Sequence, residues 1–165
     1  SMILNRVKFC CYGVAMRNNR GFTLIELLVT ITVLGVIVAF ATPTLTTSIQ
    51  RIQLNNDSRD LIDTMNGLRT EAILQQKEKI FALNSSVTPA DKIWVPTDNV
   101  IWGEGKPQDN KLTFNMMGRL KESSQCFIFL HNKNRSLKAV VIVRKSGMII
   151  FNKASSICPA DLGEE

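Results

Sequence analysis

Residues 21–43 read GFTLIELLVTITVLGVIVAFATP, a long apolar stretch near the N-terminus. Between Phe22 and Thr42 the only ionisable side chain is that of Glu26. A helix rises about 1.5 Å per residue, so about twenty apolar residues cross a hydrocarbon core about 30 Å thick. We therefore predict a helix that crosses a membrane. A carboxylate in such a helix is costly in lipid, which indicates that Glu26 has a specific role.

The residues before this stretch are basic. Arg6, Lys8, Arg17 and Arg20 lie there without any acidic residue. A flank of this kind stays on the cytoplasmic side of a membrane. We predict that residues 1–21 form a leader, with Ser1 interpreted as a scar of tag removal. Subtracting the four leader cations lowers the net charge from +6 to +2, which argues neither for nor against a nucleic-acid partner.

The sequence Gly21-Phe22-Thr23-Leu24-Ile25-Glu26 resembles the recognition site of type IV pilins and type II secretion pseudopilins. The resemblance implies that a prepilin peptidase cleaves after Gly21 and that Phe22 is then N-methylated. It also implies that Glu26 attracts the amino terminus of an adjacent subunit during assembly, and that Pro43 bends the helix. One alternative is an ordinary signal anchor with a stray glutamate. Another is a Glu26 side chain that reaches the lipid headgroups or is neutral.

From Thr44 to about Gln76 the sequence is amphipathic with a helical period. One apolar stripe consists of Leu45, Ile49 and Ile52, and a second of Leu54, Leu61, Met65, Leu68 and Ala72. Ile52 and Leu54 are two residues apart, about 200° around a helix, so the stripes face nearly opposite sides. We predict one long helix that uses the first stripe against neighbouring subunits and the second against its own domain. Two helices with a bend near Pro43 or Asn55 are the alternative.

Beyond Gln76 the period changes, and short β-prone runs follow one another between turn signals. The predicted strands are 79–83, 92–95, 100–102, 111–115, 126–131, 138–144 and 148–152. We predict the α+β class: a long N-terminal helix packed on a C-terminal antiparallel β-sheet or sandwich. Residues 22–43 would be its membrane half, and residues 44–165 a pilin-like domain. Trp94, Trp102 and Phe114 are predicted to lie in the core of the sheet.

This second region extends the resemblance. Leu68–Ile73 followed by Lys79-Ile80-Phe81 is similar to the helix end and first strand of the GspH/FimT group of minor pilins. Leu112–Gly118 is similar to the mid-domain strand and glycine turn of that group. The resemblance implies a single-pass inner-membrane protein with a periplasmic C-terminal domain, built into a filament with other major and minor pilins or pseudopilins. It implies a role in initiating or capping a type IV pilus; an H-type minor pseudopilin of type II secretion is the alternative.

Cys126 and Cys158 are the only cysteines after residue 21. On the periplasmic side that the resemblance implies, a disulfide between them would form and persist, and two free buried cysteines are the alternative. The pair resembles the tail bridge of pilus minor subunits, which favours the pilus over the secretion system. With the single His131 the two thiols fall short of a zinc set, so we predict no metal site and no cofactor. No nucleophile elbow or phosphate loop is present, and we predict that the chain is not an enzyme.

Residues 123–160 contain six cations and no acidic residue. The cations are Lys133, Arg135, Lys138, Arg144, Lys145 and Lys153. Such a cluster can contact DNA phosphates, and FimT-like members of the group are DNA receptors for natural transformation through a late Gly-Arg-x-Arg pattern. Here the corresponding turn reads Gly147-Met148-Ile149-Ile150, so both arginines are missing. We therefore favour a solvated basic face, with DNA uptake as the alternative.

Overall fold

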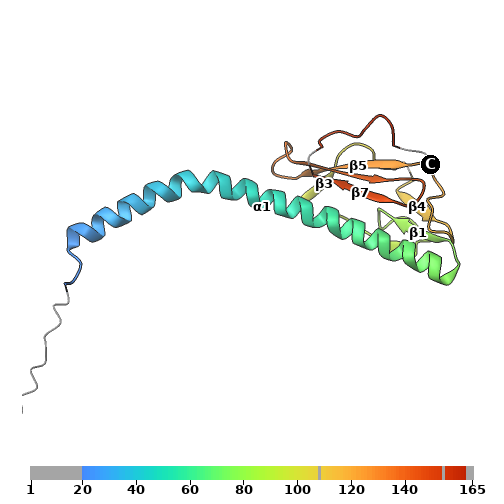
Figure 1. The fold of residues 1–165 in the computed structure, drawn as a ribbon, viewed down its shortest axis with the longest axis horizontal. Helices are drawn as coiled ribbons and strands as arrows, with labels where there is room; N and C mark the ends of the chain where they lie inside the picture. Colours follow the sequence, from blue (N-terminus) through green and yellow to red (C-terminus); the bar gives the residue numbers. More distant parts are fainter. Residues whose placement is uncertain (1–19, 108, 154, 163–165) are drawn as a thin grey trace, which may run out of the picture. The chain divides into compact units, whose positions relative to one another are not determined.

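One helix dominates the fold (Figure 1). The computed structural model describes residues 20–107, 109–153 and 155–162, and its helix α1 runs without interruption from Leu24 to Gln75. The prediction of one long helix is therefore confirmed, and Pro43 lies inside it. The chain consists of two compact units, Ser1–Ala41 and Thr42–Glu165. The bend at Pro43 stays a prediction.

In the unit Ser1–Ala41, α1 has an apolar surface that nothing in the described chain covers. Every residue from Arg20 to Ala41 is exposed, and α1 is long and apolar enough to cross a membrane. The hydroxyls of Thr30 and Thr32 donate to the carbonyls of Leu27 (2.7 Å) and Val29 (2.8 Å). These threonines therefore have internal hydrogen-bond partners, as lipid requires of polar groups.

The end of α1 has a hydrogen-bonded cap. Gln76 adopts a positive φ of 54°. The backbone N–H of Gln76 donates to the Ile73 carbonyl (3.4 Å), and that of Lys77 donates to the Ala72 carbonyl (3.2 Å). This pair of bonds satisfies carbonyls that the last helical turn leaves free. The helix therefore stops where the apolar period of the sequence ends.

Seven strands follow α1 in the described part of the chain, each at a predicted position. They are β1 (Lys79–Ala82), β2 (Lys92–Ile93), β3 (Val100–Trp102), β4 (Lys111–Phe114), β5 (Gln125–His131), β6 (Lys138–Val143) and β7 (Ile149–Asn152). They form two sheets, ordered β2-β1-β4 and β3-β5-β6-β7. In the larger sheet, Phe127 pairs with Val141 and Val141 with Phe151, so β5, β6 and β7 form an antiparallel meander.

One pairing differs from the antiparallel arrangement that the sequence predicts. Strands β1 and β2 are parallel, with Phe81 beside Lys92 and Ala82 beside Ile93. The link between the two strands brings Asp91 back beside β1, where it makes two hydrogen bonds with the backbone of Ile80. The Ile80 N–H donates to the Asp91 carboxylate (2.7 Å), and the Asp91 N–H donates to the Ile80 carbonyl (2.9 Å). This clamp sets β2 running in the same direction as β1.

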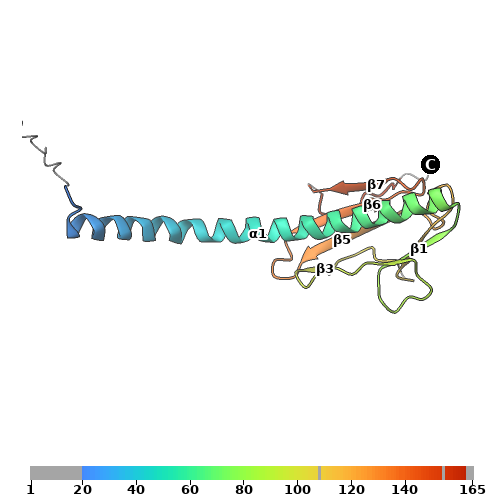
Figure 2. The ribbon, with the colours of Figure 1, turned by 90° about the horizontal axis from the view of Figure 1, so that it is seen from below.

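The main core lies between α1 and the two sheets (Figure 2). From α1 it receives the second stripe, whose members are all at most 4% exposed: Leu54, Leu61, Met65, Leu68 and Ala72. Phe81 and Phe114 of the smaller sheet and Phe127 and Phe129 of the larger one pack against them. The prediction that this stripe packs on the domain is therefore confirmed.

The tryptophans join this core, as predicted. Trp94 is buried, and the half-buried Trp102 packs against it edge to face, with ring centroids 6.2 Å apart. Phe129 contacts both rings, at 5.8 Å from Trp94 and 4.7 Å from Trp102. The Trp94 indole N–H donates to the Asp60 carboxylate of α1 (2.8 Å). The aromatic group therefore holds the sheets and the helix together.

A second, smaller core lies on the other face of the larger sheet. Side chains alternate along a strand, so Cys126 and Ile128 of β5 point away from Phe127 and Phe129. With Val140 and Ile142 of β6 they form a separate apolar cluster. Leu162 and Cys158 of the C-terminal tail pack on this cluster. The tail therefore covers the outer face of the sheet.

Candidate functional site

The predicted cleavage site lies just before the first turn of α1. The Thr23 hydroxyl accepts a hydrogen bond from the Glu26 N–H (3.2 Å), and the Thr23 carbonyl accepts one from the Leu27 N–H (3.1 Å). Thr23 is thus the N-cap of α1. Gly21 and Phe22 precede the cap, outside the helix, and Phe22 is 82% exposed. The rest of the predicted leader, residues 1–19, lies outside the described residues.

Thr23 is a site residue that our sequence reasoning missed. Thr23-Leu24-Ile25-Glu26 has the pattern of a capping box, Ser or Thr followed three residues later by Glu. The structure contains the half in which Thr23 accepts from the Glu26 N–H. The Glu26 carboxylate is exposed and makes no hydrogen bond or ion pair with any described residue. Glu26 is therefore available to a group from another molecule.

The first predicted stripe of the domain is uncovered. In the unit Thr42–Glu165, Leu45, Ile49 and Ile52 are 61%, 56% and 57% exposed. A helix that presents an apolar stripe to water normally has a partner for it. The structure therefore contains the surface that the assembly prediction requires.

Polar contacts fix α1 on the sheets at the changeover between the stripes. Asp57 accepts hydrogen bonds from both the N–H (2.9 Å) and the hydroxyl (2.8 Å) of Thr97. Further along the same side, Gln53 bonds the His131 ring (2.8 Å), and Gln50 accepts from Asn134 (3.2 Å). These bonds place the β5–β6 turn against the first turns of α1 in the domain.

At the other end of the domain, Arg69 connects α1 to two turns. Its Nε donates to the Gly118 carbonyl (2.7 Å). Gly118 has a φ of +74° and packs against Ile73, while Gly147 has a φ of +88° and packs against Gly118 and Arg69. A side chain on Gly147 would overlap the Gly118 carbonyl oxygen. The glycine turn predicted at Gly118 is therefore a point where helix, β4–β5 link and β6–β7 turn meet.

Cys126 and Cys158 form a disulfide, as predicted, with Cα atoms 6.1 Å apart and a sequence separation of 32 residues. Cys126 lies in β5, in the cluster on the outer face of the larger sheet. Cys158 lies in the tail that covers this cluster. The disulfide therefore holds the tail on the sheet.

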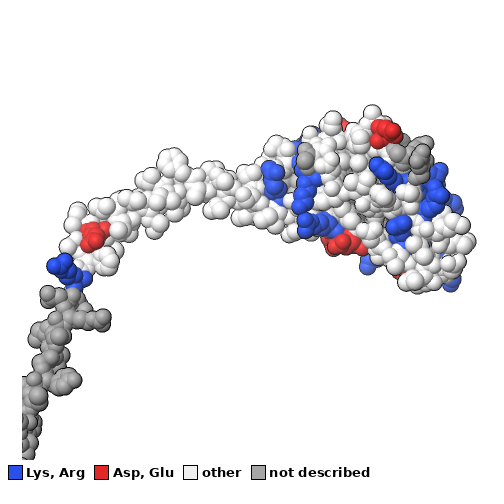
Figure 3. All heavy atoms as spheres, viewed as in Figure 1, with Lys and Arg blue, Asp and Glu red and all other residues white. Residues whose placement is uncertain are grey.

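The six candidate DNA-binding cations divide into two groups. Lys133 and Arg135 lie in the β5–β6 turn, Lys138 begins β6, and Lys153 follows β7. Arg144 and Lys145 lie at the opposite end of β6, where the Lys145 carbonyl accepts from Leu120 N–H (2.9 Å). Arg144 is only partly exposed, and its buried Nε has no hydrogen-bond partner among the described residues. Figure 3 shows basic side chains gathered toward both ends of the domain.

The first group gains a cation that the sequence did not single out. Arg51 of α1 lines one recess of about 90 Å³ together with Lys138 and Lys153. Leu54, Asn55 and Leu137 complete its wall. Three cations from three separate segments of the chain therefore surround one small volume.

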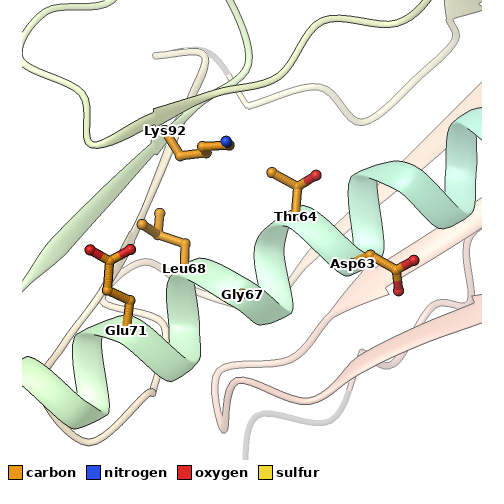
Figure 4. Close-up of a pocket in the computed structure, with 6 residues that line it drawn as sticks. All are labelled: Asp63, Thr64, Gly67, Leu68, Glu71 and Lys92. Atoms are coloured by element: carbon orange, nitrogen blue, oxygen red, sulfur yellow. The ribbon is translucent and has the colours of Figure 1, made fainter.

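A larger recess, of about 480 Å³, lies over α1 at Gly67 (Figure 4). Lys92 of β2 faces Thr64 and Leu68 across it, and the carboxylates of Asp63 and Glu71 lie at opposite ends, two helical turns apart. These carboxylates do not converge as an acid–base pair would. Within residues 20–107, 109–153 and 155–162, no group of three or more His, Cys, Asp or Glu side chains is arranged to hold a metal ion.

Comparison with known proteins agrees with the N-terminal motif and the fold. Residues 16–42 match the family model of the prokaryotic N-terminal methylation motif. A crystal structure of the type IV minor pilin FimU from Pseudomonas aeruginosa PAO1 resembles the chain with a TM-score of 0.50 and 20% identity. This match covers 68% of the present chain and 97% of the FimU chain. A second crystal form of FimU gives a TM-score of 0.48 at 20% identity, with 67% and 100% covered. No curated protein sequence matches the chain.

The chain thus combines the N-terminal methylation motif with a long helix packed on β-sheets, an arrangement similar to that of type IV pilins. Its fold is that of a minor pilin, as in FimU of P. aeruginosa. An apolar helix of this kind fits a membrane-anchored subunit that is incorporated into a filament.

Proposed function

We propose that this chain is a minor pilin that helps to initiate or cap a type IV filament. In this proposal a prepilin peptidase cleaves after Gly21, Phe22 is N-methylated, and residues 22–43 anchor the subunit in the inner membrane with the domain in the periplasm. The subunit then joins other major and minor pilins. Its role is assembly, and it is not an enzyme.

The observation that carries the proposal is the uncovered apolar surface of α1. In the unit Ser1–Ala41 it consists of exposed apolar side chains from Leu24 to Phe40, and in the unit Thr42–Glu165 it consists of Leu45, Ile49 and Ile52, just before the buried stripe that begins at Leu54. Lipid can cover the first part, but Leu45, Ile49 and Ile52 need a protein surface. Neighbouring helices of the same kind supply one when subunits polymerise.

Glu26 supports the same proposal through its charge. Cleavage at Gly21 would give Phe22 a cationic amino terminus beside the positive end of the α1 dipole, where a cation is unfavourable. The Glu26 carboxylate of an adjacent subunit would offset that charge. Because an unpaired carboxylate in lipid costs several kcal/mol, pairing in the filament would relieve both groups.

The disulfide favours a pilus subunit over a type II secretion pseudopilin. It joins the tail to the outer face of the larger sheet, in the manner that the sequence resemblance to pilus minor subunits implies. Arg144 and Lys145 lie at the opposite end of β6 from the other four candidate cations, so the six do not converge on one site, and we rank DNA uptake below assembly.

Processing and assembly are tested in one set of strains, each of which produces a prepilin peptidase together with the wild-type chain or one variant. Intact mass should show a methylated chain that begins at Phe22, and Gly21→Val should block this product. Glu26→Val should be processed normally yet be depleted in sheared filaments, and Glu26→Asp is its charge-preserving control. Normal maturation of Gly21→Val would refute the cleavage site, and equal amounts of Glu26→Val and wild type in filaments would remove Glu26 from assembly.

A further inference from the structure

We propose that Arg51, Lys138 and Lys153 form a binding site for the phosphate headgroups of anionic phospholipids. The site would hold the domain against the membrane surface before the subunit enters a filament. This inference rests on the membrane insertion of residues 22–43 proposed above. It goes beyond that proposal by giving the domain a second, electrostatic contact with the bilayer.

The first step is the convergence of charge. Arg51 comes from α1, Lys138 begins β6, and Lys153 follows β7, yet all three line the same recess. The antiparallel register brings Asn152 beside Val140, which places Lys153 near the start of β6. All three side chains are exposed. Like charges around one recess repel each other, and a bound anion relieves that repulsion.

The second step is that the three cations of the recess lack acidic partners among the described residues. Among the residues that the structure describes, no acidic side chain lies within ion-pair distance of Arg51, Lys138 or Lys153. Glu104 lines a neighbouring recess with Lys138 without pairing with it. In contrast, Lys79 and Lys121 elsewhere in the domain have acidic partners. The charge of the recess is therefore free to act on an external anion.

Two more cations lie at the same end of the domain. Lys133 and Arg135 flank Asn134, whose side-chain amide donates to Gln50, the residue before Arg51 (3.2 Å). Both cations are exposed. Five basic side chains therefore surround the helix turns that follow the predicted membrane segment.

The position along α1 brings this charge within range of headgroups. Arg51 follows Pro43 by eight residues, about 12 Å of helix. The headgroup region extends about 5–8 Å beyond the hydrocarbon on each side. The remaining gap of about 4–7 Å is shorter than the Debye length of about 8 Å at physiological ionic strength. Helical side chains also tilt toward the N-terminus, and Arg51 lines the helix surface with Pro43, Thr47 and Ser48.

The same observations favour a lipid over DNA. The recess suits one phosphate group. A DNA duplex presents phosphates along its whole length, and a protein that binds it contacts them with cations spread over a face. The remaining basic pair, Arg144 and Lys145, lies at the opposite end of β6. An anionic leaflet, in contrast, would adjoin the Arg51 end of the domain whenever residues 22–43 are inserted.

The test uses the full chain in nanodiscs of phosphatidylcholine alone, or of phosphatidylcholine mixed with phosphatidylglycerol. Lysine acetylation by an amine-reactive ester is followed site by site by mass spectrometry. Phosphatidylglycerol should slow the labelling of Lys138 and Lys153 by about fivefold, the factor expected for one cation near an anionic surface. Lys77 and Lys145 are internal controls and should react at the same rate in both lipids. Raising the salt concentration should remove the difference.

Two variants with the same change in net charge complete the test. Arg51→Gln/Lys138→Gln/Lys153→Gln should abolish the lipid-dependent protection of Lys133. The control Lys77→Gln/Arg119→Gln/Lys145→Gln, which removes exposed cations elsewhere on the domain, should retain it. Equal protection of Lys133 in both variants would overturn the site.

The other outcomes separate this proposal from the proposed function. If the chain co-elutes with nanodiscs but Lys138 and Lys153 react equally in both lipids, the lipid site is wrong and the anchor stands. If the chain does not co-elute, the membrane insertion on which both proposals depend is wrong. If a DNA duplex protects the same lysines at physiological salt and phosphatidylglycerol does not, the recess belongs to nucleic acid and the lipid site is overturned.

Discussion

Two apolar stripes of α1 lie within the unit Thr42–Glu165, and only one of them is buried. Leu45, Ile49 and Ile52 are 56–61% exposed, whereas the members of the stripe that begins at Leu54 are at most 4% exposed. Both stripes consist of apolar side chains at helical spacing, so the apolar pattern alone does not separate them. The difference is that the two sheets cover one stripe and nothing in the described chain covers the other. An apolar stripe therefore predicts burial without saying which molecule supplies the cover.

The largest effect on stability is expected from Met65→Ala in the buried stripe. Met65 is 0% exposed, and truncation of a buried Met removes packing and leaves a cavity. The free energy of unfolding should fall by about 2–5 kcal/mol. Urea denaturation of the fragment Thr42–Glu165, which contains the described core, measures it. Ile52→Ala in the exposed stripe is the control, and an equal loss there would contradict the distinction between the stripes.

A third apolar surface, the outer face of the larger sheet, is covered by the chain's own C-terminal tail, which the disulfide attaches to it. Removal of the disulfide tests how far this cover depends on the bond. Cys126→Ala/Cys158→Ala should lower the free energy of unfolding by about 2–4 kcal/mol, because the closed loop no longer restricts the unfolded chain. The tail should become sensitive to protease while the packing of Met65 is retained. Reduced wild type should behave like the double variant. Identical denaturation curves for oxidised and reduced wild type would show that the tail does not depend on the bond.

Gly67→Ala should change stability less and in the opposite direction. Gly67 is exposed, and a Cβ built there meets nothing within 4 Å. Alanine in a helix interior is favoured over glycine by about 0.8–1.0 kcal/mol, so the variant should be more stable by about that amount. Gly118→Ala is the opposite case, because φ there is +74° and the Cβ would lie 2.6 Å from Ile73 Cδ1. A destabilised Gly67→Ala would mean that the recess over α1 is not open.

The smallest change in stability is expected for Ile49→Asp. The same variant should show a large loss of incorporation into filaments. Because Ile49 is 56% exposed, the free energy of unfolding should stay within about 0.5 kcal/mol of wild type. A carboxylate in an apolar contact between subunits should nevertheless reduce the amount in sheared filaments at least tenfold. Immunoblots of filament and cell fractions measure this, with Asn66→Asp on an exposed polar position as the control. Normal incorporation of Ile49→Asp would show that the exposed stripe is not an assembly surface.

Local sequence patterns predicted the elements of the fold well. The helix limits, the seven strand positions and the side of the helix that is buried all follow from apolar periodicity and turn residues. The β1–β2 pair was not predictable in this way, because its direction depends on the contact between Asp91 and Ile80. Pairing between strands that are joined by a long link is a property of tertiary structure.

The buried stripe also contains polar residues that periodicity passed over. Asp57 and Ser58 occupy the helical positions between Leu54 and Leu61 and are 8% and 0% exposed. Thr97 satisfies Asp57, and the Leu54 carbonyl accepts from the Ser58 hydroxyl (2.9 Å). A buried polar side chain needs a hydrogen-bond partner. Ser58 has one in its own helix, whereas the partner of Asp57 lies 40 residues away in the sequence.

The candidate sites show the same limit. Gly21, Phe22 and Glu26 could be recognised because they are neighbours in one motif, and the capping-box pattern at Thr23 was readable there as well. The recess at Arg51 joins three segments that only the fold brings together, so a count of cations between residues 123 and 160 could not include Arg51.

The N-cap at Thr23 has a consequence for maturation. The peptide bond between Gly21 and Phe22 lies outside the helix, so its hydrolysis would remove no hydrogen bond that holds α1 together. The precursor and the mature subunit would then share the same helix, and maturation would have almost no conformational cost. Apart from the loss of residues 1–21, the change would be confined to the nitrogen of Phe22, where an uncharged amide would become a methylated ammonium. Processing would therefore change the chemistry of the N-terminus and leave the folded helix as it was.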